Sequence, residues 1–253
     1  MTGFTRSLKH EYECYVEQEI ENYKDSIPRS AILRIGDEAV AVMRDSEQLL
    51  LGEVVLCAEV DRIIRGRLRL PSFTTWRRRR LKLLELYRRP EHWGMAADAP
   101  LVQATPATPN ANVLVVGTPD EATTLYLTAH GCQVTTVEHD PDAVDRVLAA
   151  AGQVGLASRV HGMSGPLERW YPSEPLHCVV STPAAFERLS IEERVRVIEI
   201  LKSATLDGGV HLVRTLVAAG QSAVSCEDLV QRYDGWAVSQ LTHDSFIARK
   251  AVA

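Results

Sequence analysis

The residues best suited to chemistry are a glycine and an acid that each follow a short apolar run. Gly117 follows the run 113–116, and Glu138 follows the run 133–137, 21 positions after the glycine. A glycine at such a junction lets the chain turn tightly, and an acid at the tip of the next strand suits a pair of ribose hydroxyls. This spacing predicts the first β-α-β unit of a nucleotide-binding sheet.

The chain from Asn112 onward repeats this alternation of strands and helices. The expected strands are 113–116, 133–137, 159–161, 176–181, 210–216, 236–241 and 245–249, and the expected helices are 122–129, 142–151, 191–203 and 226–233. Such alternation predicts an α/β fold with a mostly parallel, Rossmann-like sheet covered by helices on both faces. The last two strands are joined by a short turn, which predicts an antiparallel pair at the end.

The first ninety residues predict helices instead. Apolar side chains recur at helical spacing at Tyr12, Val16, Ile20, Tyr23 and Ile27, until Pro28 ends the pattern. Three more helices are expected over 32–43, 49–68 and 75–89. Residues 96–111 contain three prolines and no periodic apolar face, which predicts a linker. The expected organisation is therefore a helical domain (1–95), a linker (96–111) and an α/β domain (112–253).

The α/β part resembles the class I S-adenosylmethionine-dependent methyltransferases. Gly117 matches the first glycine of that family's loop, Glu138 matches the acid on the ribose, and 207–209 match the turn before the fifth strand. Tyr126-Leu127 and Ala129-x-Gly131 are similar to members that act on small molecules, such as the tellurite-resistance methyltransferases. The resemblance implies a seven-stranded sheet and S-adenosylmethionine as cofactor. The contacts that it implies are Gly117, Thr118, Glu138, His139, Met163, Ser164 and Ser181.

Several residues depart from the family's pattern at cofactor positions, among them Met163, which stands where the family has an acid near the adenine. Val115 stands where the first strand normally carries an acid, and Pro119 and Glu121 stand where the loop has its second and third glycines. Proline cannot adopt positive φ and has no N–H to donate. Two functions therefore remain open: a methyltransferase that modifies a small molecule, and a methyltransferase-like scaffold or subunit that no longer binds the cofactor. The sequence identifies no catalytic residue.

A cationic segment raises a third alternative. Residues 62–89 contain 11 basic side chains and one acidic one, and the expected helix within them carries Arg77, Arg78, Arg79, Arg80 and Lys82. Phosphate groups of a nucleic acid would be attracted to such a surface. Alternatively, the acidic residues of 1–61 or of a protein partner neutralise it, and the N-terminal helices serve for self-association or partner binding.

Composition and the cysteine pattern narrow the classes of protein to which the chain could belong. The chain of 253 residues has a formal net charge of -5 and is 45% hydrophobic, which is ordinary for a globular protein. No apolar run approaches the ~18 residues of a spanning helix, and the N-terminus is too polar for a secretory signal. The five cysteines are scattered, without the spacing of a zinc site or a disulfide framework. We therefore expect a cytoplasmic protein with buried thiols and no metal.

Overall fold

The structure is a computed structural model that describes residues 7–43, 52–117, 121–215, 224–242 and 244–252. The chain forms two compact units, Met1–Lys82 and Leu83–Ala253. The division falls within a helix, so the predicted domain boundary at residue 95 lies inside the second unit. Within the described residues, every helix is too short or too polar to span a bilayer.

The first unit is helical, as predicted. Its helices are α1 (Leu8–Ser26), α2 (Arg29–Met43), α3 (Gly52–Leu68) and the first part of α4 (Phe73–Tyr87). The Ser7 hydroxyl accepts a hydrogen bond from the His10 amide at the start of α1, and Pro28 follows its end. The periodic residues of α1 form the core of the unit with Ile35 of α2 and Ile64 of α3. These helices therefore owe their stability mainly to one shared apolar seam.

The predicted linker is wrong as a description of residues 96–111. Helix α5 (Pro100–Ala104) lies in this stretch, preceded by the 3₁₀ turn η2 (Pro90–Trp93). Leu101 and Ala104 are 1% and 3% exposed and belong to the same core as the central strands. One helical turn is too short to show periodicity. The composition of 96–111, rich in proline and alanine, therefore gave no sign of a segment that packs on the sheet.

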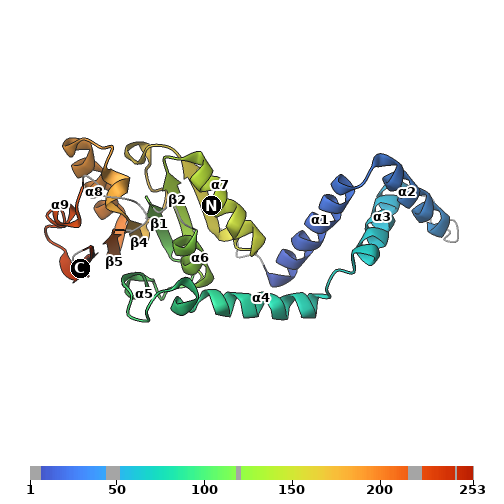
Figure 1. The fold of residues 1–253 in the computed structure, drawn as a ribbon, viewed down its shortest axis with the longest axis horizontal. Coiled ribbons are helices and arrows are strands. Elements are labelled where there is room, and N and C mark those ends of the chain that lie inside the picture. Colours follow the sequence, from blue (N-terminus) through green and yellow to red (C-terminus); the bar gives the residue numbers. More distant parts are fainter. Residues whose placement is uncertain (1–6, 44–51, 118–120, 216–223, 243, 253) are drawn as a thin grey trace. The chain divides into compact units, whose positions relative to one another are not determined.

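The second unit contains one sheet of seven strands in the order β3-β2-β1-β4-β5-β7-β6. Figure 1 shows β2, β1, β4 and β5 side by side in this sheet. The strands are β1 (Asn112–Val116), β2 (Gln133–Glu138), β3 (Val160–Ser164), β4 (Leu176–Ser181), β5 (Thr205–Arg214), β6 (Ala237–Thr242) and β7 (Ser245–Arg249). Strands β1 to β5 pair with one another in parallel, and β7 is antiparallel to both β5 and β6. This confirms the predicted seven-stranded, mostly parallel, Rossmann-like sheet. The strand order reverses between β1 and β4.

Helices cover both faces of this sheet. They are α6 (Ala122–Ala129), α7 (Pro141–Gln153), α8 (Ile191–Ala204) and α9 (Cys226–Val230), with 3₁₀ turns η3 (Ala157–Arg159), η4 (Leu167–Arg169) and η5 (Pro183–Phe186). In β1, Leu114 and Val116 pack with α8 and α9, whereas Val113 and Val115 pack with α5 and α6. Because side chains alternate along a strand, a run of valine and leucine here is buried on both sides.

Strand β5 begins earlier than predicted. The stretch 207–209, expected as a turn before the strand, lies inside it. The register moves from Leu176 opposite Thr205 to Cys178 opposite Val210, and Gly208 has a φ of 75°. Extra residues on one strand of a pair form a bulge, and glycine supplies the positive φ. The turn residues were recognised correctly, but pairing with β4 continues on both sides of them.

Candidate functional site

Five strand ends meet at the carboxyl edge of the parallel sheet. Val116 pairs with both Val137 and Ser181, so Gly117 emerges between the end of β2 and the end of β4. Glu138 pairs with Ser164 at the end of β3. In open α/β sheets a ligand binds outside the carboxyl ends, where the strand order reverses. Glu138 therefore lies at the tip of the strand beside β1, as the sequence predicted.

The turn at Gly117 is held by the segment that follows β4. Gly117 has a φ of 68°, and a Cβ there would lie 2.5 Å from Thr182 Oγ1 and 2.9 Å from the Ala185 amide nitrogen. The Thr182 hydroxyl donates to the Gly117 carbonyl at 2.7 Å, and its amide donates to the Val116 carbonyl at 3.2 Å. The glycine is therefore required by a close approach within the chain, before any ligand is considered.

The predicted contact residues differ in how far their side chains are exposed to solvent. Glu138 is half-buried, while His139 and Ser164 are exposed beside it. Ser181 is only 1% exposed, so the structure encloses this side chain rather than placing it on the open edge. Thr118 lies outside the described residues.

Met163 differs from its neighbour Ser164 in direction. It pairs with Val137, whereas Ser164 pairs with Glu138. Successive side chains of a strand point to opposite faces, so Met163 leaves the sheet on the other side from Glu138. It is 48% exposed there. Strand register thus brings Glu138 and Ser164 together and does not bring Met163 to them.

Of the departures from the family's pattern, Pro119 lies outside the described residues, whereas Val115 and Glu121 lie within them. Val115 is fully buried in the core beside α5 and α6 and offers no polar group to a ligand. Glu121 is exposed at the start of α6 and makes no side-chain cap. Its carboxylate is therefore solvated and accepts no hydrogen bond from the backbone amides of the first turn of the helix.

Sequence reasoning missed Arg214, which ends β5 at the same edge. Its guanidinium donates a hydrogen bond to the hydroxyl of Thr123 in α6, a residue that is 1% exposed. The half-buried arginine thus links the end of β5 to the helix that follows β1. A basic residue directly after the mostly apolar run 210–213 is the sequence signal that could have identified it.

Two histidines near the sheet have structural partners. The His130 ring lies 3.2 Å from the Arg88 carbonyl, Arg88 donates to the Ala129 carbonyl, and burial lowers the pKa of His130. His177 accepts from the Asn112 amide at 3.1 Å, at the amino ends of β1 and β4. Neither ring reaches the carboxyl edge, so neither is a candidate base for chemistry there.

A third histidine is enclosed in the core. His211 of β5 is fully buried, 2.8 Å from the Thr205 hydroxyl and 3.0 Å from the Tyr233 hydroxyl. Burial, with Lys202 and Lys250 nearby, lowers the pKa of His211 to about 3. Burial also raises the pKa of Tyr233 above its ordinary value. The network stays neutral across the physiological range and fixes the packing of β5 against the segment after α9.

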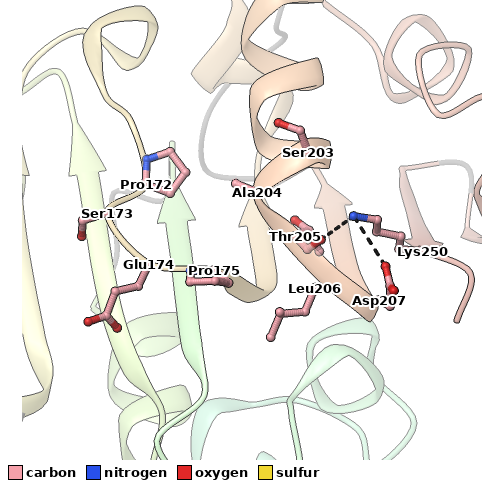
Figure 2. Close-up of a pocket in the computed structure, with 10 residues that line it drawn as sticks. All are labelled: Pro172, Ser173, Glu174, Pro175, Ser203, Ala204, Thr205, Leu206, Asp207 and Lys250. Carbon is pink, nitrogen blue, oxygen red and sulfur yellow. Dashed lines mark hydrogen bonds and ion pairs between the residues drawn. The ribbon is translucent and has the colours of Figure 1, made fainter. Parts of the chain in front are cut away.

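The described cavities lie at the opposite edge of the sheet. One of about 480 Å³ is lined by 172–175, 203–207 and Lys250, where β4 and β5 begin (Figure 2). Lys250 Nζ donates to the Thr205 carbonyl at 2.6 Å and lies 3.8 Å from Asp207. This lysine therefore caps the end of α8. A second cavity of about 390 Å³ lies between α5 and the start of β5. Among the described residues, no group of three or more potential ligands could hold a metal ion.

Several solved structures that are similar to the chain are methyltransferases. The N-methyltransferase NodS from Bradyrhizobium japonicum WM9 is 13% identical, with 70% of this chain and 97% of that chain covered and a TM-score of 0.47. The TehB-like methyltransferase from Corynebacterium glutamicum is 16% identical, with 69% and 98% covered and a TM-score of 0.46. The glycopeptide N-methyltransferase MtfA with S-adenosylhomocysteine is 11% identical, with 66% and 90% covered and a TM-score of 0.47.

No family model matches the chain, and no curated protein does. The fold assignment rests on the strand order and register of the sheet itself.

Proposed function

We propose that the second unit binds S-adenosylmethionine at the carboxyl edge of β1 and β2 and transfers its methyl group to a small molecule. The observation that carries the proposal is the position of Glu138, a half-buried carboxylate that ends the strand beside Gly117. The strand order reverses next to this point, between β1 and β4. A carboxylate there can accept hydrogen bonds from both hydroxyls of a ribose.

The residues present fit the adenosine half of the cofactor better than the methionine half. Glu138 and Ser164 supply polar groups at neighbouring strand ends, on the same side of the sheet. Val115 supplies none for the amino group of the methionine. Arg214 contributes positive charge at this edge, which would suit the methionine carboxylate.

A shortage of acid–base groups at the edge is compatible with this chemistry. Bound S-adenosylmethionine would supply an activated methyl group on a sulfonium. The protein then needs chiefly to hold an acceptor in line with that group, and positioning alone accounts for a large share of such rate enhancements. The residues of this edge would act by binding and orientation.

The alternative is a scaffold that no longer binds the cofactor. It is favoured by the packing of Thr182 and Ala185 against Gly117, which explains the glycine without a ligand. The two functions make opposite predictions about binding, so one titration separates them.

The test is isothermal calorimetry of the full chain with S-adenosylmethionine, S-adenosylhomocysteine and 5′-methylthioadenosine. We expect micromolar dissociation constants, and weakening of about tenfold or more by Glu138→Ala, because two hydrogen bonds to a charged acceptor are lost. Glu192→Ala, which removes an exposed acid at the start of α8, is the matched control and should leave binding unchanged.

Methylthioadenosine tests the fit to the adenosine half, since it should bind with the same dependence on Glu138. An absence of binding by all three ligands at millimolar concentration would exclude the enzyme and leave the scaffold.

A further inference from the structure

The cationic segment of the first unit divides into paired and unpaired side chains. Arg62 forms an ion pair with Glu59 at 2.6 Å, and Arg67 pairs with Glu38. Arg80 is 7% exposed and lies 3.7 Å from Glu11. Neutralisation by the acidic N-terminal helices, one of the alternatives from the sequence, therefore accounts for these three arginines.

Four cations of α4 are not neutralised in this way. Arg77, Arg78, Arg79 and Lys82 are all exposed, and none forms an ion pair with any residue in the described ranges. We call these four residues the α4 cationic face. Glu85, three positions after Lys82, is the one acid of α4, and the stretch 76–82 that carries the four cations contains none.

The packing of α4 determines where this face points. Phe73 and Trp76 lie in the core of the first unit, and Arg80 is buried one turn further on. At about 100° per residue, Arg78 and Lys82 fall opposite this stripe, one turn apart. Arg77 and Arg79 flank them, so the positive charge spreads over a broad arc of the helix surface.

We propose that the α4 cationic face binds the phosphate backbone of a nucleic acid. Guanidinium groups suit phosphate because they donate paired hydrogen bonds in a fixed plane and keep their charge at every physiological pH. Three guanidinium groups and the Lys82 ammonium on the outer surface of one helix supply the sequence-independent attraction that dominates backbone binding. The proposal concerns the first unit and does not depend on the cofactor site of the second.

An anionic membrane fits this face less well. An interfacial helix inserts an apolar face beside its cations. The apolar side of α4 is already occupied, since the Trp76 ring packs 5.5 Å from the Tyr12 ring and 6.1 Å from the Tyr15 ring, measured between centroids. The exposed large apolar side chains of α4 are two, Leu81 at 40% and Leu86 at 41%, and two leucines make a small apolar surface for insertion.

The test is fluorescence anisotropy of the full chain with a labelled 20-nucleotide RNA strand and a 20-base-pair DNA duplex, over a series of KCl concentrations. With four phosphates neutralised, the slope of log K against log salt should be about −3 for the single strand and about −3.6 for the duplex. The two probes compare a flexible single strand with a duplex as the source of the phosphates.

Three variants make the result specific to this face. The fourfold variant R77Q/R78Q/R79Q/K82Q should lose at least about 100-fold in affinity at low salt and most of the slope. R146Q/R169Q/R188Q/R196Q removes the same charge from four exposed arginines of the second unit and should bind as the wild type does. R77K/R78K/R79K keeps the charge and should keep the slope.

Three outcomes would overturn the proposal. The first is no binding of either probe by the wild type at low salt. The second is equal weakening by the two fourfold variants, which would show a response to net charge alone. The third is binding to phosphatidylserine vesicles, lost in the α4 variant, without binding to either nucleic acid. Circular dichroism of each variant checks that the helices are intact.

Discussion

Replacement of Gly117 by alanine tests whether the turn after β1 is held by the segment after β4. The structure gives two separate costs for Gly117→Ala. Its φ of 68° costs an L-residue about 1–2 kcal/mol. The new Cβ would also lie 2.8 Å from the Ala185 Cβ and 2.9 Å from its amide nitrogen, and overpacking of this kind typically costs about 1–3 kcal/mol.

Gly94 provides a control that separates these costs. It has nearly the same φ, 67°, but no atom lies within 4 Å of the position that a Cβ would take. Gly94→Ala should therefore show only the backbone cost. The difference between the two variants measures the packing against Ala185 and Thr182, which we expect to be about 1–3 kcal/mol.

Hydrogen exchange is the appropriate measurement, because it reports on the segments around Gly117 separately from the rest of the chain. Amides of β1 and of 176–186 should exchange roughly 5- to 150-fold faster in Gly117→Ala than in Gly94→Ala, which is the expected difference in free energy expressed as a rate. The loss should appear without any ligand. Equal protection of these segments in the two variants would show that the segment after β4 does not press on Gly117.

Two further predictions concern the second unit. In the folded chain His211 stays neutral down to a pKa of about 3, whereas in the unfolded chain it takes up a proton near pH 6.5. The free energy of unfolding should therefore fall as the pH drops between these two values, by roughly 1.4 kcal/mol per pH unit. Urea unfolding at pH 7, 6 and 5 should show a shallower fall for His211→Gln than for His161→Gln, whose ring is exposed; parallel curves would contradict this. At the start of α8, the Ser190 hydroxyl accepts a hydrogen bond from the Glu193 amide, and the Glu193 carboxylate accepts one from the Ser190 amide. Ser190→Ala should therefore lower the free energy of unfolding by about 1 kcal/mol in thermal unfolding. Glu193→Gln keeps an acceptor at this position and should change the free energy of unfolding little.

The sequence by itself determined the order and type of most elements. The valine-rich run of β1 alternates between two cores, and its composition alone reveals a strand buried on both faces. Pro28 ends α1 where the helical spacing ends. Glu138 was placed at a strand tip by counting residues, because a strand, a helix and a second strand of ordinary length fit between it and β1. These features depend on neighbours along the chain, so local pattern is sufficient to find them.

Contacts between distant residues were decided only by the tertiary structure. Thr182 and Ala185 are more than sixty positions from Gly117, and no local pattern connects them to the turn that they hold. Pairing with β2 sets the direction of Met163, and enclosure by the fold removes Ser181 from the open edge.

The same distinction applies to the charges. The sequence counts the basic residues of 62–89, but only the packing of helices shows that Arg67 and Arg80 meet acids of α2 and α1 while the α4 cationic face does not. Burial and ion pairing depend on which surfaces meet, and those surfaces come from residues that are far apart in the chain.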